Sequence, residues 1–207
     1  IKCFNIESPA ELDRIANTAR NLGLKAHISV RVNPNIDAHV DHHVATGLGD
    51  SKFGVKLTDV IALYQKAAEL KEIEIEGISC HIGSLVESTV PYMSEIEVLS
   101  VFVNELLDRG IALKHFDIGG GAGVAYKADE KTLEPSELIP AVVAQIRSLV
   151  KIPDIEILIE PGRSIIAQAG VLLTRVEYLK SGLFERNFCV VDLSLIHISE
   201  PTRQAEI

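Results

Sequence analysis

The sequence predicts an α/β protein in which parallel strands form part of a barrel and a β-rich segment follows. Strand and helix patterns alternate along residues 1–165 of the 207-residue chain, which is typical of βαβ units and a parallel sheet. A polar or glycine cluster follows each predicted strand, at the edge where parallel α/β folds bind ligands. Because five such clusters would meet on one face, the pattern favours a barrel mouth over the crevice of a doubly wound sheet.

The first helix has the clearest boundaries of the predicted elements. Ser8 and Glu11 form a capping box, and Pro9 suits the first helical position. Apolar residues then recur at helical spacing until Gly23, which ends the helix. The strand candidates are 2–6, 27–32, 73–81, 113–118 and 155–159, and the helix candidates are 9–22, 58–70, 90–109 and 135–150.

The pattern changes after Gly162, where strand candidates at 170–179 and 188–191 follow without an intervening helix. Two successive strands of this kind predict a boundary into an antiparallel domain. We therefore expect residues 1–165 to form the partial barrel and residues 166–192 to form the first strands of a β-rich domain.

Composition excludes several classes of protein. Apolar residues make up 47% of the chain and charged residues 24%, which rules out a wholly disordered chain. No apolar run reaches the length of a transmembrane helix. The net charge of -9 argues against a nucleic-acid or anionic-membrane surface. Three widely spaced cysteines, Cys3, Cys80 and Cys189, predict buried free thiols and hence a cytoplasmic protein.

A glycine-rich turn follows the fourth predicted strand, at residues 117–123 (DIGGGAG). Gly119, Gly120 and Gly121 leave backbone N–H groups exposed and permit the close approach of an anion such as a phosphate. A dinucleotide site is less well supported, because the G-x-G-x-x-G pattern is absent and no helix starts directly after the turn. A flexible turn without a ligand is the alternative.

Two further clusters place polar groups at strand ends. Glu160 and Arg163, in the stretch EPGR, could pair with a cationic ring nitrogen and bind a phosphate, or form a structural ion pair. His81 and Ser84, in HIGS, offer an imidazole for ring stacking and a hydroxyl for a phosphate, although a lone histidine is usually structural. A phosphate cradle, a carboxylate for a ring nitrogen and an imidazole together describe a pyridoxal 5′-phosphate site.

The loop after the second strand is rich in metal-ligand types. They are Asp37, His39, Asp41, His42 and His43. Their spacing fits no standard tetrahedral pattern, and a long polar loop explains them equally well. We therefore predict no metal site.

Seven short motifs occur in the order found in one enzyme family. They are FNIES (4–8), RVNP (31–34), TGL (46–48), KFG (52–54), HIGS (81–84), DIGGG (117–121) and EPGRS (160–164). Over about residues 1–192 the chain resembles the diaminopimelate decarboxylases, which are fold-type III, alanine-racemase-like pyridoxal phosphate enzymes. The resemblance implies decarboxylation of meso-2,6-diaminopimelate to L-lysine and CO2, by a homodimer whose active sites are shared between subunits.

The family's fold is a (β/α)8 TIM barrel followed by a β-rich domain, so this chain would hold about five of the eight barrel strands. The cofactor-binding residues implied by the resemblance are His81, Ser84, Gly119, Gly120, Gly121, Glu160, Pro161, Gly162, Arg163 and Arg31. Arg163 would also lie near the substrate carboxylate. Lys52 looks like the family's structural lysine near the dimer contact.

The departures from the family pattern are equally specific. Leu85 stands where the family usually has glutamine. The cofactor-bearing lysine, in a Tyr-Ala-x-Lys context, and the cysteine of a Cys-Glu-Ser motif are not found, and residues 125–127 (AYK) only echo the former. We therefore assign no catalytic residue within the chain and expect it to be inactive alone. Residues 193–207 lose the family pattern, and we expect a non-native tail rather than a divergent one.

Two other functions are consistent with the same motifs. A decarboxylase of ornithine or arginine shares HIGS and EPGR, and a non-catalytic binding protein could use the same scaffold. The chain starts with Ile1 inside a strand pattern, so we expect an internal segment of a barrel. The absent strands would then leave the inward faces of Val30, Ile78 and Ile157 in water, and the chain alone should be poorly soluble.

Overall fold

A computed structural model describes residues 1–38, 47, 51–126, 129–182 and 186–194 of the chain. The chain divides into two compact units, Ile1–Ala167 and Gln168–Ile207. The larger unit carries the parallel sheet, its helices and all the predicted site residues, so the two units are described separately.

Helix α1 (Pro9–Leu22) forms as the sequence predicts, and its capping contacts explain why. The Glu11 N–H donates to Ser8 Oγ at 3.2 Å, and the Glu7 N–H donates to the Glu11 carboxylate at 2.7 Å. Gly23 ends the helix in the left-handed conformation, with φ of 65°. Both ends of α1 are therefore set by local sequence.

In the described part of the larger unit, six parallel strands form the sheet. They are β1 (Phe4–Ile6), β2 (Ala26–Asn33), β3 (Val55–Lys56), β4 (Ile73–Cys80), β5 (His115–Asp117) and β6 (Glu156–Leu158). Their order is β1-β2-β4-β5-β6, with β3 paired to the end of β2. Because this order never reverses along the chain, the sheet is the wall of a partial barrel and not a doubly wound sheet.

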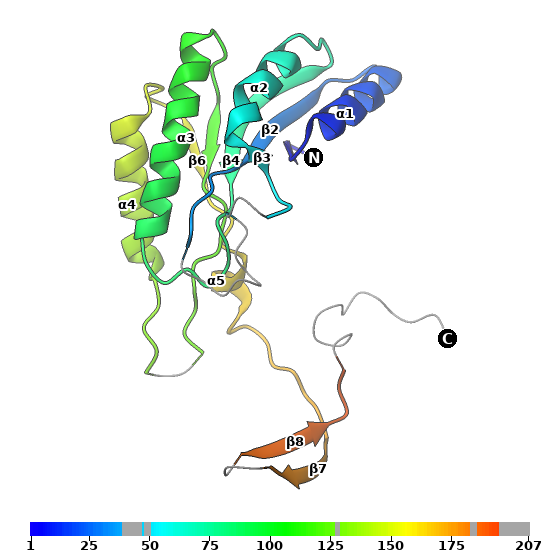
Figure 1. Ribbon diagram of the computed structural model, residues 1–207, viewed down its shortest axis with the longest axis vertical. Helices are drawn as coiled ribbons and strands as arrows, with labels where there is room; N and C mark the ends of the chain where they lie inside the picture. The colour runs from blue at the N-terminus through cyan, green and yellow to red at the C-terminus, as the bar shows by residue number, and fades with distance from the viewer. Residues whose placement is uncertain (39–46, 48–50, 127–128, 183–185, 195–207) are drawn as a thin grey trace. The chain divides into compact units, whose positions relative to one another are not determined.

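Helices cover one face of this sheet (Figure 1). They are α1, the short η1 (Leu57–Asp59) with α2 (Val60–Ala68), α3 (Val90–Asp108) and α4 (Pro135–Leu149). Their apolar faces form one buried core with the strands. The predicted fold class, a partial barrel of alternating strands and helices followed by β structure, is confirmed.

The two faces of the sheet differ from the prediction in one respect. Val30 and Ile78 are fully buried in the core with the helices, and Ile157 is partly buried and packs against this core. Our expectation that these three residues face the barrel interior is therefore wrong. Arg31, Ser79 and Asp117 alternate with them and are paired across β2, β4 and β5 on the opposite face. The strands are apolar toward the helices and polar toward the interior. Composition alone does not reveal which alternate set faces the helices.

Two short elements were not predicted: β3, and α5 (Gly162–Ile166), which follows β6 directly. In the second unit, β7 (Val176–Ser181) and β8 (Asn187–Val191) form an antiparallel pair. The strand predicted from residue 170 therefore begins later. Residues 195–207 of the expected non-native tail lie outside the described part of the chain.

The three cysteines are free thiols, but only Cys80 is buried. Cys3 is half-buried and Cys189 is exposed on β8, so burial of all three was a wrong expectation. No helix in the described part of the chain is long and apolar enough to cross a membrane.

Candidate functional site

A polar cavity of about 280 Å³ lies at the carboxyl ends of the strands. Its lining residues come from β1, β2, β4 and β6 or from the loops that follow them: Asn5, Glu7, Arg31, Ser79, Cys80, His81 and Glu160. Three predicted site residues, Arg31, His81 and Glu160, are thus brought together from separate strand ends. This is the arrangement expected of a barrel mouth.

The glycine turn after β5 is packed against its neighbours at backbone distance. A Cβ on Gly119 would overlap the Cys80 carbonyl oxygen, and one on Gly120 would overlap that of Glu160. Gly119 and Gly121 also have φ values of 67° and 98°, which favour glycine. Glycine is therefore required at these positions by the approach of the loops after β4 and β6.

Two of the three glycine N–H groups are already used inside the protein. Gly119 donates to Asp117 Oδ1 at 2.8 Å, and Gly120 donates to His81 Nδ1 at 3.2 Å. No hydrogen bond within the described part of the chain uses the Gly121 N–H. Of the three glycine N–H groups predicted to bind an anion, only that of Gly121 therefore lacks an acceptor within the described residues.

The same contacts orient His81. Its Nδ1 accepts from Gly120, so the ring proton of neutral His81 lies on Nε2. Burial and the nearby Arg31 guanidinium lower the pKa of His81, in spite of the opposing effect of Glu160. His81 is therefore a neutral, half-buried imidazole of fixed orientation, which suits stacking on an aromatic ring.

Asp117 and Glu160 form a pair of carboxyl groups behind the turn. Burial raises the pKa of Asp117 to about 6, and the neighbouring Glu160 contributes to the rise. Glu160 itself is exposed at the cavity, and its backbone N–H donates to the Gly119 carbonyl at 2.7 Å. The Glu160 carboxylate can therefore face a ligand, while Asp117 holds the turn.

Arg31 is fixed on the opposite wall of the cavity. Its Nη1 donates to Glu7 Oε1 at 2.8 Å, and its guanidinium lies 5.1 Å from the Phe53 ring centre. The other oxygen of Glu7 accepts the Gly54 N–H at 2.9 Å. Lys52 stacks on the same ring at 5.0 Å. This ion pair ties β1, β2 and the 51–54 segment together beside His81.

The remaining predicted residues lie beside the cavity rather than in its lining. Ser84 is half-buried and follows Gly83, whose carbonyl oxygen occupies the space of a Cβ on Gly121. Pro161 lines an apolar cavity with Gly119 and Gly120, and Gly162 starts α5. Leu85 adopts a left-handed conformation with φ of 66°.

Arg163 is exposed, and its Nη1 donates to the Tyr126 hydroxyl. No ion pair joins Arg163 to Glu160 within the described residues, which argues against the structural ion pair considered from the sequence.

Sequence reasoning missed the roles of Glu7, Asp117 and Tyr126. Glu7 and Asp117 stand in the polar clusters at strand ends, so their position was a usable signal, whereas nothing in the sequence pairs Tyr126 with Arg163. A further carboxyl group, Glu95 on α3, is buried close to Cys80, and burial holds its pKa well above the usual range.

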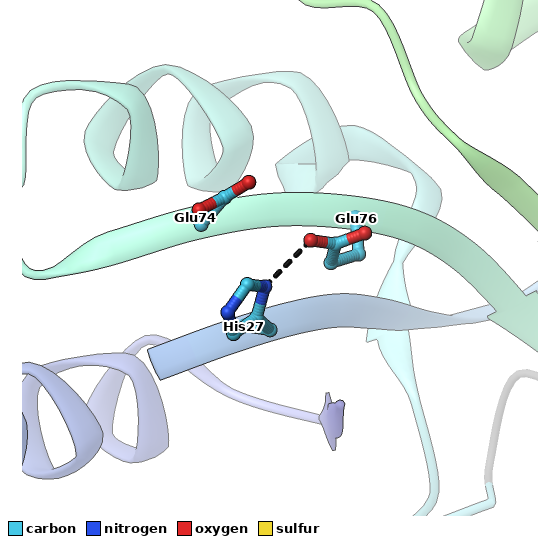
Figure 2. A group of neighbouring side chains, drawn as sticks. All are labelled: His27, Glu74 and Glu76. Atoms are coloured by element: carbon cyan, nitrogen blue, oxygen red, sulfur yellow. Dashed lines mark hydrogen bonds and ion pairs between the residues drawn. The ribbon is translucent and has the colours of Figure 1, made fainter. Parts of the chain in front are cut away.

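One group of side chains resembles a metal site in composition. His27, Glu74 and Glu76 lie close together near the start of β2 and β4, as Figure 2 shows. His27 Nδ1 is 2.6 Å from Glu76 Oε1, while the Lys114 ammonium lies 2.7 Å and 2.8 Å from the two glutamates. Lys114 pairs with both carboxylates, so we assign the group as an ion-pair network. Of the predicted metal-ligand types, His39, Asp41, His42 and His43 lie outside the described residues.

Comparison with known families adds an independent line of information. The family model described as pyridoxal-dependent decarboxylase, pyridoxal binding domain, matches residues 1–167. The chain is 40% identical over 201 residues to the diaminopimelate decarboxylase of Pseudomonas aeruginosa, covering 97% of this chain and 47% of that protein. It is 41% identical, over the same length and shares, to that of Haemophilus influenzae. The chain thus spans about half the length of the curated relatives it matches.

Solved structures show the same relationship. Diaminopimelate decarboxylase from Helicobacter pylori complexed with L-lysine matches with a TM-score of 0.81 and 35% identity, covering 92% of this chain and 46% of that one. A lysine decarboxylase from Selenomonas ruminantium matches with a TM-score of 0.73 and 26% identity, covering 94% and 47%.

Proposed function

The chain belongs to the pyridoxal-dependent decarboxylase family, whose pyridoxal-binding domain matches residues 1–167, and we propose that it forms part of a diaminopimelate decarboxylase. Such an enzyme converts meso-2,6-diaminopimelate to L-lysine and CO2. The observation that carries the proposal is the convergence of His81, Gly121 and Glu160 around one glycine turn. The similarity to curated diaminopimelate decarboxylases supports the choice of substrate.

The residues present fit pyridoxal phosphate. The Gly121 N–H has no acceptor within the described part of the chain, and the turn leaves no room for side chains that would cover it. His81 offers a neutral ring face, and Glu160 offers an exposed carboxylate. These three groups match the phosphate, the ring face and the ring nitrogen of the cofactor.

Each side chain has a distinct task in this proposal. Glu160 would keep the proton on the ring nitrogen, since a carboxylate favours the charged form of a neighbouring base. His81 would hold the ring by stacking, and Arg163 with Gly121 and Ser84 would bind the phosphate. Arg163 would also meet a substrate carboxylate. The bound cofactor supplies the electron sink that makes loss of CO2 feasible.

The polar cavity contains no lysine among its lining residues. The amine that anchors the cofactor aldehyde must therefore come from elsewhere in the proposed enzyme. We extend the proposal to a homodimer. We also place the enzyme in the cytoplasm, in agreement with three free cysteines.

The decisive experiment uses a hybrid in which the matching part of this chain replaces the corresponding segment of the Pseudomonas aeruginosa relative. CO2 release is measured with added cofactor from meso-diaminopimelate, L-ornithine, L-arginine and L-lysine. We expect release from meso-diaminopimelate above the other three, and a dimer by size-exclusion chromatography. The unmodified relative sets the reference rate.

A matched variant separates this chain's contribution from that of its host. Glu160→Gln in the hybrid should keep cofactor and lose turnover, because an amide does not favour the protonated ring nitrogen. A loss below about threefold, or roughly 0.7 kcal/mol of barrier, would remove Glu160 from this role. A cofactor-loaded hybrid that prefers ornithine or arginine would contradict the substrate assignment. One that is inactive on all four amino acids would favour a non-catalytic binding protein.

A further inference from the structure

Arg163 and Tyr126 form a contact that the proposed function does not yet use. Arg163 Nη1 donates to the Tyr126 hydroxyl, across the space between α5 and the segment after the glycine turn. Tyr126 is held in turn by its backbone N–H, which donates to Glu130 Oε2 at 2.8 Å. The phenol, on a backbone held by Glu130, is therefore an acceptor for a guanidinium on helix α5.

The position of Arg163 depends on this contact more than on any charge. Within the described residues Arg163 has no carboxylate partner, and its side chain is exposed. An exposed arginine loses considerable rotamer freedom when it binds a ligand. A hydrogen bond that holds the guanidinium beforehand reduces that cost.

The start of α5 lies beside the glycine turn. Pro161 and Ser164, on either side of Arg163 in sequence, line one apolar cavity with Gly119 and Gly120. The backbone of residue 160 also contacts Gly120. The Arg163 side chain thus starts close to the glycine turn. Tyr126 accepts from Nη1, and no hydrogen bond within the described residues uses Nη2 or Nε.

We propose that Tyr126 is a positioning residue that orients Arg163 toward the phosphate of the cofactor. The inference rests on the proposed function, because it takes the phosphate as the ligand of Arg163. Tyr126 itself does not touch the ligand in this account; it acts only through the guanidinium.

A purely structural role for Tyr126 is a weak alternative. Its side chain is 63% exposed, so replacement by phenylalanine removes the hydroxyl and little packing. Tyr178 in the second unit is 59% exposed, and no hydrogen bond within the described part of the chain uses its hydroxyl. Tyr178→Phe is therefore a matched control for the removal of an exposed phenol oxygen.

The test measures binding to the cofactor-free hybrid defined above. Dissociation constants are determined for pyridoxal 5′-phosphate and for pyridoxal, which lacks the phosphate. We expect Tyr126→Phe to weaken binding of the phosphate form about tenfold, the scale of one hydrogen bond to a charged group. Binding of pyridoxal should stay unchanged, and Tyr178→Phe should change neither constant.

A double-mutant cycle then asks whether Tyr126 acts through Arg163. In an Arg163→Met background, Tyr126→Phe should have no further effect on either constant. An effect that persists in this background, an equal loss for both ligands, or no loss for the phosphate form would each overturn the inference. Failure of the proposed function has another signature: the hybrid with native Tyr126 would bind pyridoxal as tightly as its phosphate.

Discussion

Replacement of Gly121 by alanine tests whether the glycine turn is built by close backbone packing. A Cβ at this position would overlap the Gly83 carbonyl oxygen, and φ is 98°. The left-handed conformation alone costs an L-residue about 1–2 kcal/mol. Relief of the overlap requires the turn to move. This movement strains the hydrogen bond of 2.9 Å from the Val86 N–H to the Gly121 carbonyl and the hydrogen bond from the Gly120 N–H to His81 Nδ1. Overpacking of this kind adds about 1–3 kcal/mol.

Gly110 provides the matched control, because it separates backbone conformation from overlap. Its φ is 83°, and a Cβ there would meet nothing within 4 Å. It follows α3 and precedes β5, so it lies in a helix-to-strand loop, away from the carboxyl ends of the strands. Gly110→Ala should therefore lower the free energy of unfolding only by the cost of the left-handed conformation, about 1–2 kcal/mol.

The assay compares both variants in the hybrid by urea unfolding and by cofactor affinity. Gly121→Ala should lower the unfolding free energy by about 2–5 kcal/mol and weaken cofactor binding more than tenfold. Gly110→Ala should leave cofactor affinity unchanged. Equal stability losses in the two variants, or an intact affinity in Gly121→Ala, would refute the packing argument.

Two further predictions concern charge, and a third concerns turnover by the chain alone. The raised pKa of Asp117, about 6 against an ordinary 3.8, means that the folded state binds its proton more tightly than the unfolded state does. The free energy of unfolding should therefore fall by up to about 3 kcal/mol as pH rises from about 4 to about 6. Asp117→Asn should abolish this pH dependence, as measured by urea unfolding at a series of pH values. Glu7→Gln removes the carboxylate partner of the partly buried Arg31 and should lower the free energy of unfolding by about 1–3 kcal/mol. Glu105→Gln removes an exposed i,i+4 ion pair and should lower it by less than about 1 kcal/mol. Equal losses in these two variants would contradict the difference in burial. The 207-residue chain alone should release no CO2 from meso-diaminopimelate, because its polar cavity has no lysine, and measurable turnover would contradict this.

Much of the larger unit could be predicted because its signals are local. The capping residues of α1, the helix end at Gly23 and the alternation of strands with helices depend on neighbours in sequence. The elements that were missed are short: β3 has two residues and α5 has five. Elements of this length have no periodicity of their own and form because longer elements position them.

A different reason explains why the sequence did not predict which strand residues point toward the helices. Every second residue of β2 is apolar, but in β4 the alternation shifts by one residue at Gly77, between Ile75 and Ile78, and both faces of the sheet exclude water to some extent. As apolar residues, Val30 and Ile78 could lie on either face of the sheet, and it is their packing against the helices that places them on one of the two. The polar set that remains, which includes Arg31 and Ser79, then defines the cavity.

The candidate site was predicted by residue type, but the way it is held together follows only from the structure. The oxygens that fill the space of the three Cβ atoms belong to Cys80, Gly83 and Glu160, so the loops after β4, β5 and β6 meet at backbone distance. The same turn binds His81 through the Gly120 N–H and the Glu160 backbone through the Gly119 carbonyl.

Backbone contacts therefore set the geometry of the site, and side chains set its chemistry. Glu160→Gln should change how the cofactor reacts while the turn keeps its shape, because Glu160 contacts the turn through its backbone. His81→Ala would in addition remove the acceptor of the Gly120 N–H. A single added methyl group on the turn should move both groups at once. The glycine run is consequently the feature of the site that tolerates the least change, even though it contributes no side chain to the reaction.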